Sequence, residues 1–331
     1  QAIWNTAHGR PFQITLGEQS VLESHFSPAL ALFAPVYWLW SDIRVLAILQ
    51  AALMSGAGLL IYWYLRDEQP WLGLAVYAAY LMHPALHQVY LSGFRRETLA
   101  ILTTSLVLFF LLRRRYGWML FWLAVTLLTK EDMGFTCFGV GLYLTALERR
   151  WKLGLPLAAC GLAYVILIPY KVMPALAGGG SYAMAEAYFS YLGHSPGQML
   201  RAALTQPSLW LHYLLQGARL RAVARFFLPS LGLFVLAPQI AAFLLPYMAY
   251  MLLSSSDALG LLGGWYPSVL LVFLFWAVAL GARRLPLGWQ KPAAGLLVGA
   301  GLACWAAFSQ LWPGPNFQPA LFQVTAHDQQ V

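Results

Sequence analysis

Charged residues are scarce in this sequence. Only 10% of its 331 residues are Asp, Glu, Lys or Arg, whereas 60% are hydrophobic and 14 are tryptophan. A soluble domain carries about 25% charged residues and cannot hide so much apolar surface. The composition therefore excludes a soluble globular protein and predicts an all-α, polytopic transmembrane helix bundle.

Cysteine is equally rare, and its placement excludes two further classes. Cys137, Cys160 and Cys304 lie within apolar runs, and none has a neighbour at the spacing of a zinc or redox motif. The formal charge of +8 does not indicate a nucleic-acid partner, because the basic residues form short clusters at the ends of apolar runs. Such clusters are typical of topology signals in membrane proteins.

A start methionine and a signal peptide are also lacking. The chain opens on QAIWNTAHGRPF, which is not a membrane span. We therefore expect a processed, truncated or incompletely known sequence.

Apolar runs predict about ten membrane-spanning helices. Several are shorter than the ~20 residues that cross a full hydrocarbon core, so their connections must dip into the membrane or the bilayer must thin there. Residues 27–40 are too short to span, and we expect them to form an interfacial helix with Tyr37, Trp38 and Trp40 at headgroup level. The predicted spans are residues 43–65, 70–82, 98–112, 117–128, 133–147, 153–174, 219–236, 239–253, 266–282 and 292–311.

The predicted spans divide the chain into three parts. Residues 1–42 form an extracytoplasmic first loop, residues 43–311 form the transmembrane bundle with an outer loop at 175–207, and residues 312–331 form an extracytoplasmic tail.

Alternating spans place the clustered basic residues on one side, which the positive-inside rule makes cytoplasmic. Asp67, Glu68 and Glu148 are the acids on that side, whereas the other acids and all seven histidines fall on the opposite side. The polar chemistry is therefore expected at the extracytoplasmic face. The basic residues of the cytoplasmic side are Arg66, Arg113–Arg115, Arg149, Arg150, Lys152, Arg283, Arg284 and Lys291.

The stretch His83–Glu97 (HPALHQVYLSGFRRE) concentrates polar groups between two apolar runs. It holds two histidines, Arg95, Arg96 and Glu97. Charges at the ends of spans usually face a cavity, a partner or water, because facing lipid costs several kcal/mol. This stretch is therefore the first candidate site, and a solvated loop is the alternative.

A second concentration follows one hairpin later. Thr129–Asp132 (TKED) forms a sharp turn that carries three charges to the membrane interface, close enough to Arg96 and Glu97 to share a site. Neighbouring cations lower the pKa of a carboxyl group and neighbouring acids raise it, which can tune a base. The alternative is a Lys–acid pair that only neutralises the turn.

Three weaker signals lie elsewhere on the outer face. His25 precedes Ser27–Pro28, a plausible helix start, and could orient a hydroxyl or a phosphate. The loop between Met173 and Pro207 carries Gly178–Gly180, which fit a mobile lid or a close backbone approach but lack the context of a nucleotide-binding loop. The loop's aromatic and polar residues, Tyr182, Glu186, Tyr188, Tyr191 and His194, fit a sugar-binding surface or an ordinary interfacial belt.

Arginines also gather on the outer face, where the positive-inside rule disfavours them. Arg219, Arg221 and Arg225 lie close together, and Arg221 and Arg225 share a helical face. They could contact the phosphate of a donor or of a lipid headgroup, and nonspecific attraction to membrane lipids is the alternative.

Several motifs carry a family resemblance. QAIWNTAHGRPF, HFSPALALFAPVYWLW and the LTKED run that ends at Asp132 resemble the bacterial membrane proteins called domain of unknown function 2079, from Gln1 to about Phe275. That family is grouped with the GT-C glycosyltransferases, which move a sugar from a polyprenyl-phosphate carrier to an acceptor at the extracytoplasmic face. The resemblance implies a GT-C-like bundle in the bacterial inner membrane.

The resemblance also implies where the sugar donor binds. A polyprenyl-phosphate sugar would lie between the spans, with its phosphate near Lys130 and Arg96 and with Arg221, Arg225 and His25 as further substrate contacts.

An acid would deprotonate the acceptor hydroxyl for an inverting, in-line displacement. Glu97 is the first candidate for this catalytic base and Glu23 is the second. Glu131 and Asp132 would bind substrate by setting the electrostatics of the site or would hold a divalent cation, although two adjacent acids are not specific for a metal.

The sequence departs from the family's pattern where chemistry is expected. In the family an Asp typically stands immediately before the first motif, and this chain begins at Gln1. Two alternatives therefore stay open: an inactive subunit of a larger membrane protein complex, and a lipid or solute transporter, although no inverted repeat supports the latter. The further departures are Ser24–His25 for Asp-His, Arg95–Glu97 for His-Pro-Glu, and Trp265–Tyr266 for a His-Tyr pair.

Overall fold

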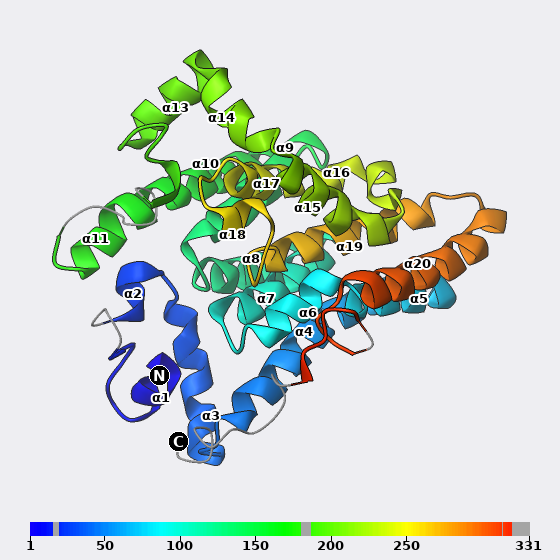
Figure 1. The fold of residues 1–331 in the computed structure, drawn as a ribbon, viewed down its shortest axis with the longest axis horizontal. Coiled ribbons are helices and arrows are strands. Elements are labelled where there is room, and N and C mark those ends of the chain that lie inside the picture. The colour runs from blue at the N-terminus through cyan, green and yellow to red at the C-terminus, as the bar shows by residue number, and fades with distance from the viewer. Residues whose placement is uncertain (16–19, 180–186, 313, 320–331) are drawn as a thin grey trace.

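The computed structural model shows an all-α protein (Figure 1). It describes residues 1–15, 20–179, 187–312 and 314–319. Within these ranges there is no β-strand, only an isolated bridge between Gln13 and Ser20. The predicted all-α class is therefore confirmed.

Long helices build the bundle, and shorter ones cover its ends. The helices of at least twelve residues in the described ranges are α4 (Arg44–Leu65), α5 (Pro70–Leu81), α7 (Arg96–Leu112), α8 (Tyr116–Leu127), α9 (Gly134–Ala146), α10 (Trp151–Leu167), α19 (Ser268–Arg283) and α20 (Leu287–Phe308). The shorter elements include α1 (Ala2–Ala7), α2 (Val21–Ser24), η1 (Pro28–Phe33), α3 (Ala34–Leu39), α6 (Pro84–Leu91), η2 (Glu131–Met133), η3 (Ile168–Val172), α11 (Met173–Leu176), α13 (Pro196–Thr205), α14 (Pro207–Leu214), α15 (Gly217–Phe227), η4 (Leu228–Ser230), η5 (Leu233–Leu236), α16 (Pro238–Ala241), α17 (Leu244–Leu252) and α18 (Asp257–Gly260).

Helix α19 forms the centre of the bundle. Every residue from Ser268 to Ala282 is buried, and the helix packs against α4, α5, α7 and η5. A helix that is apolar on all sides belongs in an interior. Its buried Trp276 indole is hydrogen-bonded, because Nε1 donates to Ser105 Oγ (2.9 Å), which in turn donates to the Ala57 carbonyl (2.7 Å).

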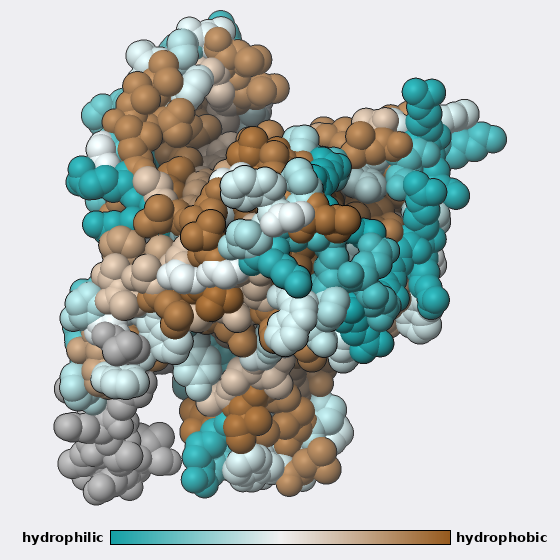
Figure 2. Space-filling model, turned by 90° about the vertical axis from the view of Figure 1, so that its right-hand side faces the viewer, coloured by the Kyte–Doolittle hydropathy of each residue, from teal (hydrophilic) through white to brown (hydrophobic). Residues whose placement is uncertain are grey.

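Three described helices are long and apolar enough to cross a membrane by length and composition. They are Arg44–Leu65, Trp151–Leu176 and Leu287–Phe308. Shorter apolar helices are Pro28–Leu39, Pro70–Leu81, Tyr116–Leu127 and Ser268–Arg283. Much of the molecular surface is hydrophobic, as Figure 2 shows for one face, with hydrophilic residues gathered in separate patches.

Two of the predicted spans are not continuous helices. We expected a continuous helix over residues 219–236, but α15 gives way to η4 at Leu228, and the backbone turns left-handed at Leu231 (φ 51°) and Gly232 (φ 72°) before η5. Pro229 and Gly232 break the helix, and the apolar composition concealed that break. The predicted span 239–253 is likewise divided into α16 and α17.

The segment before α4 has an exposed apolar side, as an interfacial helix requires. Trp38 and Leu39 are 69% and 89% exposed, whereas Tyr37 is buried, so Tyr37 does not reach the surface position we expected for it. Figure 1 places α1 and α3 at one edge of the molecule, with α13 and α14 standing out at the other.

Helices α9 and α10 pack closer than side chains would allow. A Cβ on Gly134 would lie 2.6 Å from the carbonyl oxygen of Gly161, and a Cβ on Gly141 would lie 2.7 Å from that of Gly154. Small residues at such positions let helix backbones touch, which is a common way to join helices in a membrane. We call this contact the glycine seam.

The glycine seam gives a stability prediction. Gly161→Ala should destabilise the protein by about 1–3 kcal/mol, because the new methyl group would overlap the backbone of α9. Gly299→Ala on α20 is the matched control, since a Cβ there meets no atom within 4 Å. Denaturant unfolding in detergent measures both variants, and equal stabilities would contradict the close contact.

Candidate functional site

Three consecutive charged residues lie between α8 and α9, and the last two of them begin a short 3-10 helix. η2 follows Lys130, and the backbone N–H of Met133 donates to the Lys130 carbonyl (3.2 Å). The turn is anchored by Thr129, whose buried Oγ1 donates to the Thr126 carbonyl (2.6 Å). These bonds hold Lys130, Glu131 and Asp132 inside the protein.

Lys130 joins two carboxylates from different parts of the chain. Its Nζ lies 3.3 Å from Glu97 Oε1, at the start of α7, and 3.0 Å from Asp132 Oδ2. Arg96 Nε lies 3.6 Å from the same Glu97 oxygen. Because Glu97 is 2% and Lys130 7% exposed, these charges must compensate one another within the protein. We call Arg96, Glu97, Lys130 and Asp132 the charge cluster.

Glu131 faces the N-terminal segment instead. Its Oε1 lies 2.9 Å from His25 Nδ1, and its Oε2 accepts a hydrogen bond from the backbone N–H of Phe26 (3.2 Å). The Ala29 N–H also donates to the carbonyl of Leu128, at the end of α8 (2.9 Å). The structure thus brings His25, predicted from an isolated motif, onto the TKED turn.

Burial and neighbouring charges set the protonation of this turn. Burial raises the pKa of Glu131, but His25 and Lys130 outweigh it and hold that pKa below its ordinary value. Burial, with the Glu131 carboxylate adding to it, keeps the pKa of Asp132 above its ordinary value despite Lys130. Burial lowers the pKa of Lys130, but Asp132 and Glu97 outweigh it and raise that pKa well above normal. Asp132 is therefore the carboxylate of this turn that is best tuned to take up a proton.

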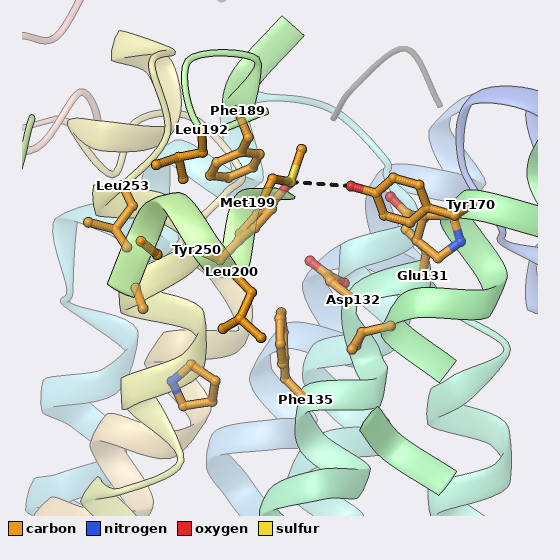
Figure 3. Close-up of a pocket in the computed structure, with 15 residues that line it drawn as sticks. Glu131, Asp132, Phe135, Tyr170, Phe189, Leu192, Met199, Leu200, Tyr250 and Leu253 are labelled. Carbon is orange, nitrogen blue, oxygen red and sulfur yellow. Dashed lines mark hydrogen bonds between the residues drawn. The ribbon is translucent and has the colours of Figure 1, made fainter. Parts of the chain in front are cut away.

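A cavity of about 450 Å³ opens beside Asp132. In Figure 3, Asp132 lies on one side of the cavity near Glu131 and Phe135, and Tyr250 and Leu200 lie on the other. Asp132 Oδ1 has no hydrogen-bond partner among the described residues. The cavity is thus a largely apolar space with two carboxylates at one wall, Asp132 and the Glu131 carboxylate that contacts His25 and Phe26.

A second cavity of about 250 Å³ lies next to the first along α9. Pro246 of α17 lines both cavities. On α9, Phe135 lines the first, and Phe138, Leu142 and Ala146 line the second, at the three- to four-residue spacing of one helical face. We call the two cavities together the α9 groove; at 1.5 Å per residue, α9 gives it a length of about 20 Å.

Neither residue predicted as the base lines this groove. Glu97 lies on the other side of the Lys130 ammonium, paired with Lys130 and Arg96. Glu23, in α2, is half-buried and forms no ion pair with any described residue. Asp132 was predicted to bind substrate, and it lines the cavity.

The arginines of α15 divide into two kinds. Arg219 is fully buried and donates to the carbonyls of Leu252 (2.6 Å) and Ser254 (2.7 Å), so it is not free to contact a phosphate as we had expected. Arg221 and Arg225 are exposed, and neither lines the α9 groove. Arg225 lines a different pocket.

Both histidines of the stretch 83–97 have structural roles. We expected polar groups in a connection, but α6 occupies much of it. The ring of His83 accepts from the Ala85 N–H (3.1 Å) and lies 3.0 Å from the Phe226 carbonyl. His87 contacts Ser309 Oγ (2.7 Å) and the Leu81 carbonyl (2.8 Å). These buried rings cap and link helices.

The donor set of the charge cluster does not fit a divalent cation. In the part of the chain that the structure describes, no group of three or more His, Cys, Asp or Glu side chains is placed to hold a metal ion. Between Glu97 and Asp132, the position that a cation would fill is taken by the Lys130 ammonium.

Part of the predicted outer loop falls outside the described residues, namely Gly180, Tyr182 and Glu186, as do tail residues 320–331. Gly178 and Gly179 are described, and both have positive φ (78° and 111°), a conformation that glycine adopts without strain. Tyr191 donates to the Leu253 carbonyl (2.5 Å), which ties the end of this loop to the wall of the first cavity.

Tyr170 and Tyr250 also line the first cavity, and sequence reasoning missed both. The only local signal was the Pro169–Tyr170–Lys171 interruption of an apolar run, which the structure forms as a π-helix. Such distortions of α-helices often occur at functional sites.

The opposite ends of the helices carry the basic clusters. Arg283 pairs with Glu68, and Arg114 Nε lies 3.3 Å from Glu148 Oε2. Helix α7 starts at Arg96 and ends before Arg113, so the charge cluster and the basic clusters lie at opposite ends of the bundle.

Apolar helices of spanning length, a bundle centred on a wholly buried helix and charges at its two ends define an integral membrane protein. Residues 1–312 match the family described as predicted membrane protein (DUF2079), and the chain belongs to that family. The family resemblance expected from the sequence is therefore confirmed. No curated protein and no solved structure matches the chain significantly.

Proposed function

We propose that this protein is a GT-C-like glycosyltransferase that moves a sugar from a polyprenyl-phosphate donor to an acceptor. The observation that carries the proposal is the α9 groove, two adjacent, mainly apolar cavities of which the first has the Asp132 carboxylate in its wall. Ligand sites are typically apolar with a few convergent polar groups. A lipid-linked sugar matches that arrangement, because its chain is apolar and its reacting end is polar.

Asp132, in place of Glu97, is the proposed base. It lines the cavity, its Oδ1 has no partner among the described residues, and its pKa is raised. A raised pKa brings a base closer to the operating pH. Glu97 becomes a positioning residue, because it holds the Lys130 ammonium that contacts Asp132.

The proposed reaction is a single in-line displacement. Asp132 takes the proton of the acceptor hydroxyl, and the acceptor oxygen forms a bond to the anomeric carbon. The bond between that carbon and the phosphate oxygen breaks, and polyprenyl phosphate leaves with the electron pair. The sugar configuration is inverted.

Arg96 is the proposed contact of the leaving phosphate; it lines neither cavity, and it lies beside Glu97, which together with Asp132 contacts Lys130. The Lys130 ammonium is already shared by two carboxylates, so it is less open to a phosphate than the sequence alone indicated. Arg96 Nε has no hydrogen-bond partner among the described residues, although it lies in ion-pair range of Glu97. A guanidinium is well suited to phosphate oxygens.

The proposed location is the bacterial inner membrane, with the site at the extracytoplasmic face. The positive-inside rule supports this orientation, since the basic clusters lie at the end of the bundle opposite the charge cluster.

Donors of different chain length test the proposal. The purified full-length protein should transfer sugar from long-chain and short-chain polyprenyl-phosphate sugars. Ala242→Trp, in the second cavity, should raise KM roughly tenfold for the long-chain donor alone. Each buried CH₂ contributes about 0.8 kcal/mol, so losing two of them costs about a factor of ten.

Ala303→Trp is the matched control, because Ala303 is exposed on α20 and lines none of the three pockets described in this protein. If Ala242→Trp affected both donors equally, the chain would not follow the groove. If the wild-type protein transferred no sugar from any donor, the glycosyltransferase proposal itself would fail.

A further inference from the structure

A third pocket, of about 210 Å³, lies apart from the α9 groove. It forms where α6, α15, the residues after α18 and the end of α20 meet, and none of its described lining residues lines the groove. His83 and Phe226 make part of its wall, and their mutual hydrogen bond (3.0 Å) fixes α6 against α15. The pocket is therefore built on packed helices.

Three polar side chains without a hydrogen bond or an ion pair to the described residues line this pocket. Gln88, Arg225 and Asn316 line it, and none of their side chains forms a hydrogen bond or an ion pair with the described residues. The Arg225 guanidinium lies 5.3 Å from the ring centroid of Phe308, which forms another wall. The wall thus offers one guanidinium, two amides and an aromatic face.

The charged side chain in the described lining of the pocket is positive. No Asp or Glu is among its described lining residues, and His83 has both ring nitrogens engaged in hydrogen bonds. A guanidinium without a carboxylate partner pairs well with phosphate, and amides can both donate to and accept from hydroxyl groups. The pocket is therefore suited to an anion that also carries hydroxyls.

We propose that this pocket binds a phosphate ester bearing hydroxyl groups, with Arg225 on the phosphate and Gln88 and Asn316 on the hydroxyls. The same chemistry occurs in a glycerol-bearing lipid headgroup and in a soluble polyol phosphate. The site is separate from the groove and does not depend on the proposed sugar transfer.

Arg221 provides a matched control on the same helix. It is exposed, lies one turn from Arg225 and carries the same charge, but does not line the pocket. Nonspecific attraction to an anionic surface would use both arginines alike. A built site requires Arg225 only.

The test measures phosphatidylglycerol retained by the full-length protein in phosphatidylcholine nanodiscs, using native mass spectrometry. Arg225→Gln should weaken retention roughly tenfold, the loss expected for a charge-assisted hydrogen bond, and Arg221→Gln less than about twofold. Equal losses in both variants, or no loss in Arg225→Gln, would exclude a lipid headgroup as the ligand. The proposal as a whole would then depend on the soluble ligands tested next.

Glycerol phosphate and inorganic phosphate, titrated against the same variants, distinguish the sources. Arg225-dependent binding of glycerol phosphate supports a soluble ligand, and Arg225-dependent retention of the lipid alone supports a headgroup. If neither lipid retention nor binding of the soluble ligands depends on Arg225, the proposed site does not exist.

Gln88→Leu tests whether Gln88 contacts the ligand, because a purely structural residue would not change the preference between lipids. It should reduce the preference for phosphatidylglycerol over phosphatidic acid, which lacks the glycerol hydroxyls, while leaving the unfolding midpoint unchanged. An unchanged preference would exclude Gln88 from the site.

Discussion

Replacing Asp132 with asparagine should lower the rate of sugar transfer roughly 10²–10⁴-fold, the range for removing a general base. The variant keeps the size of the side chain and an oxygen that can accept from Lys130 Nζ, now 3.0 Å from Asp132 Oδ2. It loses the ability to take up a proton. Initial rates with a polyprenyl-phosphate sugar and an excess of acceptor measure the effect.

Asp257→Asn is the control for this experiment. Asp257 is the first residue of α18; its side chain is 83% exposed and lies 3.7 Å from Arg219 Nη2, outside the groove. Its replacement should leave the rate within about twofold. An Asp132→Asn variant that kept wild-type activity would remove Asp132 from the mechanism.

The pH dependence has a definite sign. A base acts in its deprotonated form, so the rate should fall as the pH drops through the pKa of Asp132. Since that pKa is raised, the fall should begin at a higher pH than for an ordinary aspartate. Asp132→Asn should lose this acidic limb.

The largest expected loss of stability comes from Lys130→Met. Removing one partner of a buried ion pair typically costs about 3–5 kcal/mol, because the other charge stays buried without compensation. Here two carboxylates, Glu97 and Asp132, would lose their shared ammonium, whose side chain is 9% exposed. Chemical unfolding in detergent or bicelles measures the change.

A matched variant and a second substitution show whether the stability loss of Lys130→Met comes from the lost charge or from lost packing. Lys171→Met removes an exposed lysine of η3 and should change stability by less than about 0.5 kcal/mol. Adding Glu97→Gln to Lys130→Met should recover part of the loss, since it removes one uncompensated charge. If the double variant were no more stable than Lys130→Met alone, packing would be the cause.

Much of the charge cluster could be predicted from the sequence, and the reason is topological. Arg96 and Glu97 start one helix and Lys130–Asp132 follow the next hairpin, so alternate crossing brings them to one end. The bonds of His25 and Phe26 to Glu131 join residues more than one hundred positions apart, and only the motif before Pro28 indicated that a polar group belonged there.

Other features depend on packing that the sequence pattern does not contain. Glu97 and Asp132 both carry a carboxylate and both lie in a short charged segment next to an apolar run. Of these two, only Asp132 lines the cavity. Arg219 and Arg225 likewise looked equivalent, but Arg219 is enclosed against Gly260 and Arg225 is exposed. In both cases the difference depends on which side of the element packs against its neighbours, and the sequence pattern does not specify that side.

The glycine seam affects which wall of the groove can move. Gly134 follows η2 directly, and its backbone rests on that of Gly161, so no side chain separates the two helices at that point. Helix α13 contributes Met199 and Leu200 to the first cavity but has no buried residue of its own. We therefore expect the wall that carries Asp132 to keep its position when a ligand enters, and α13 to be the wall that moves.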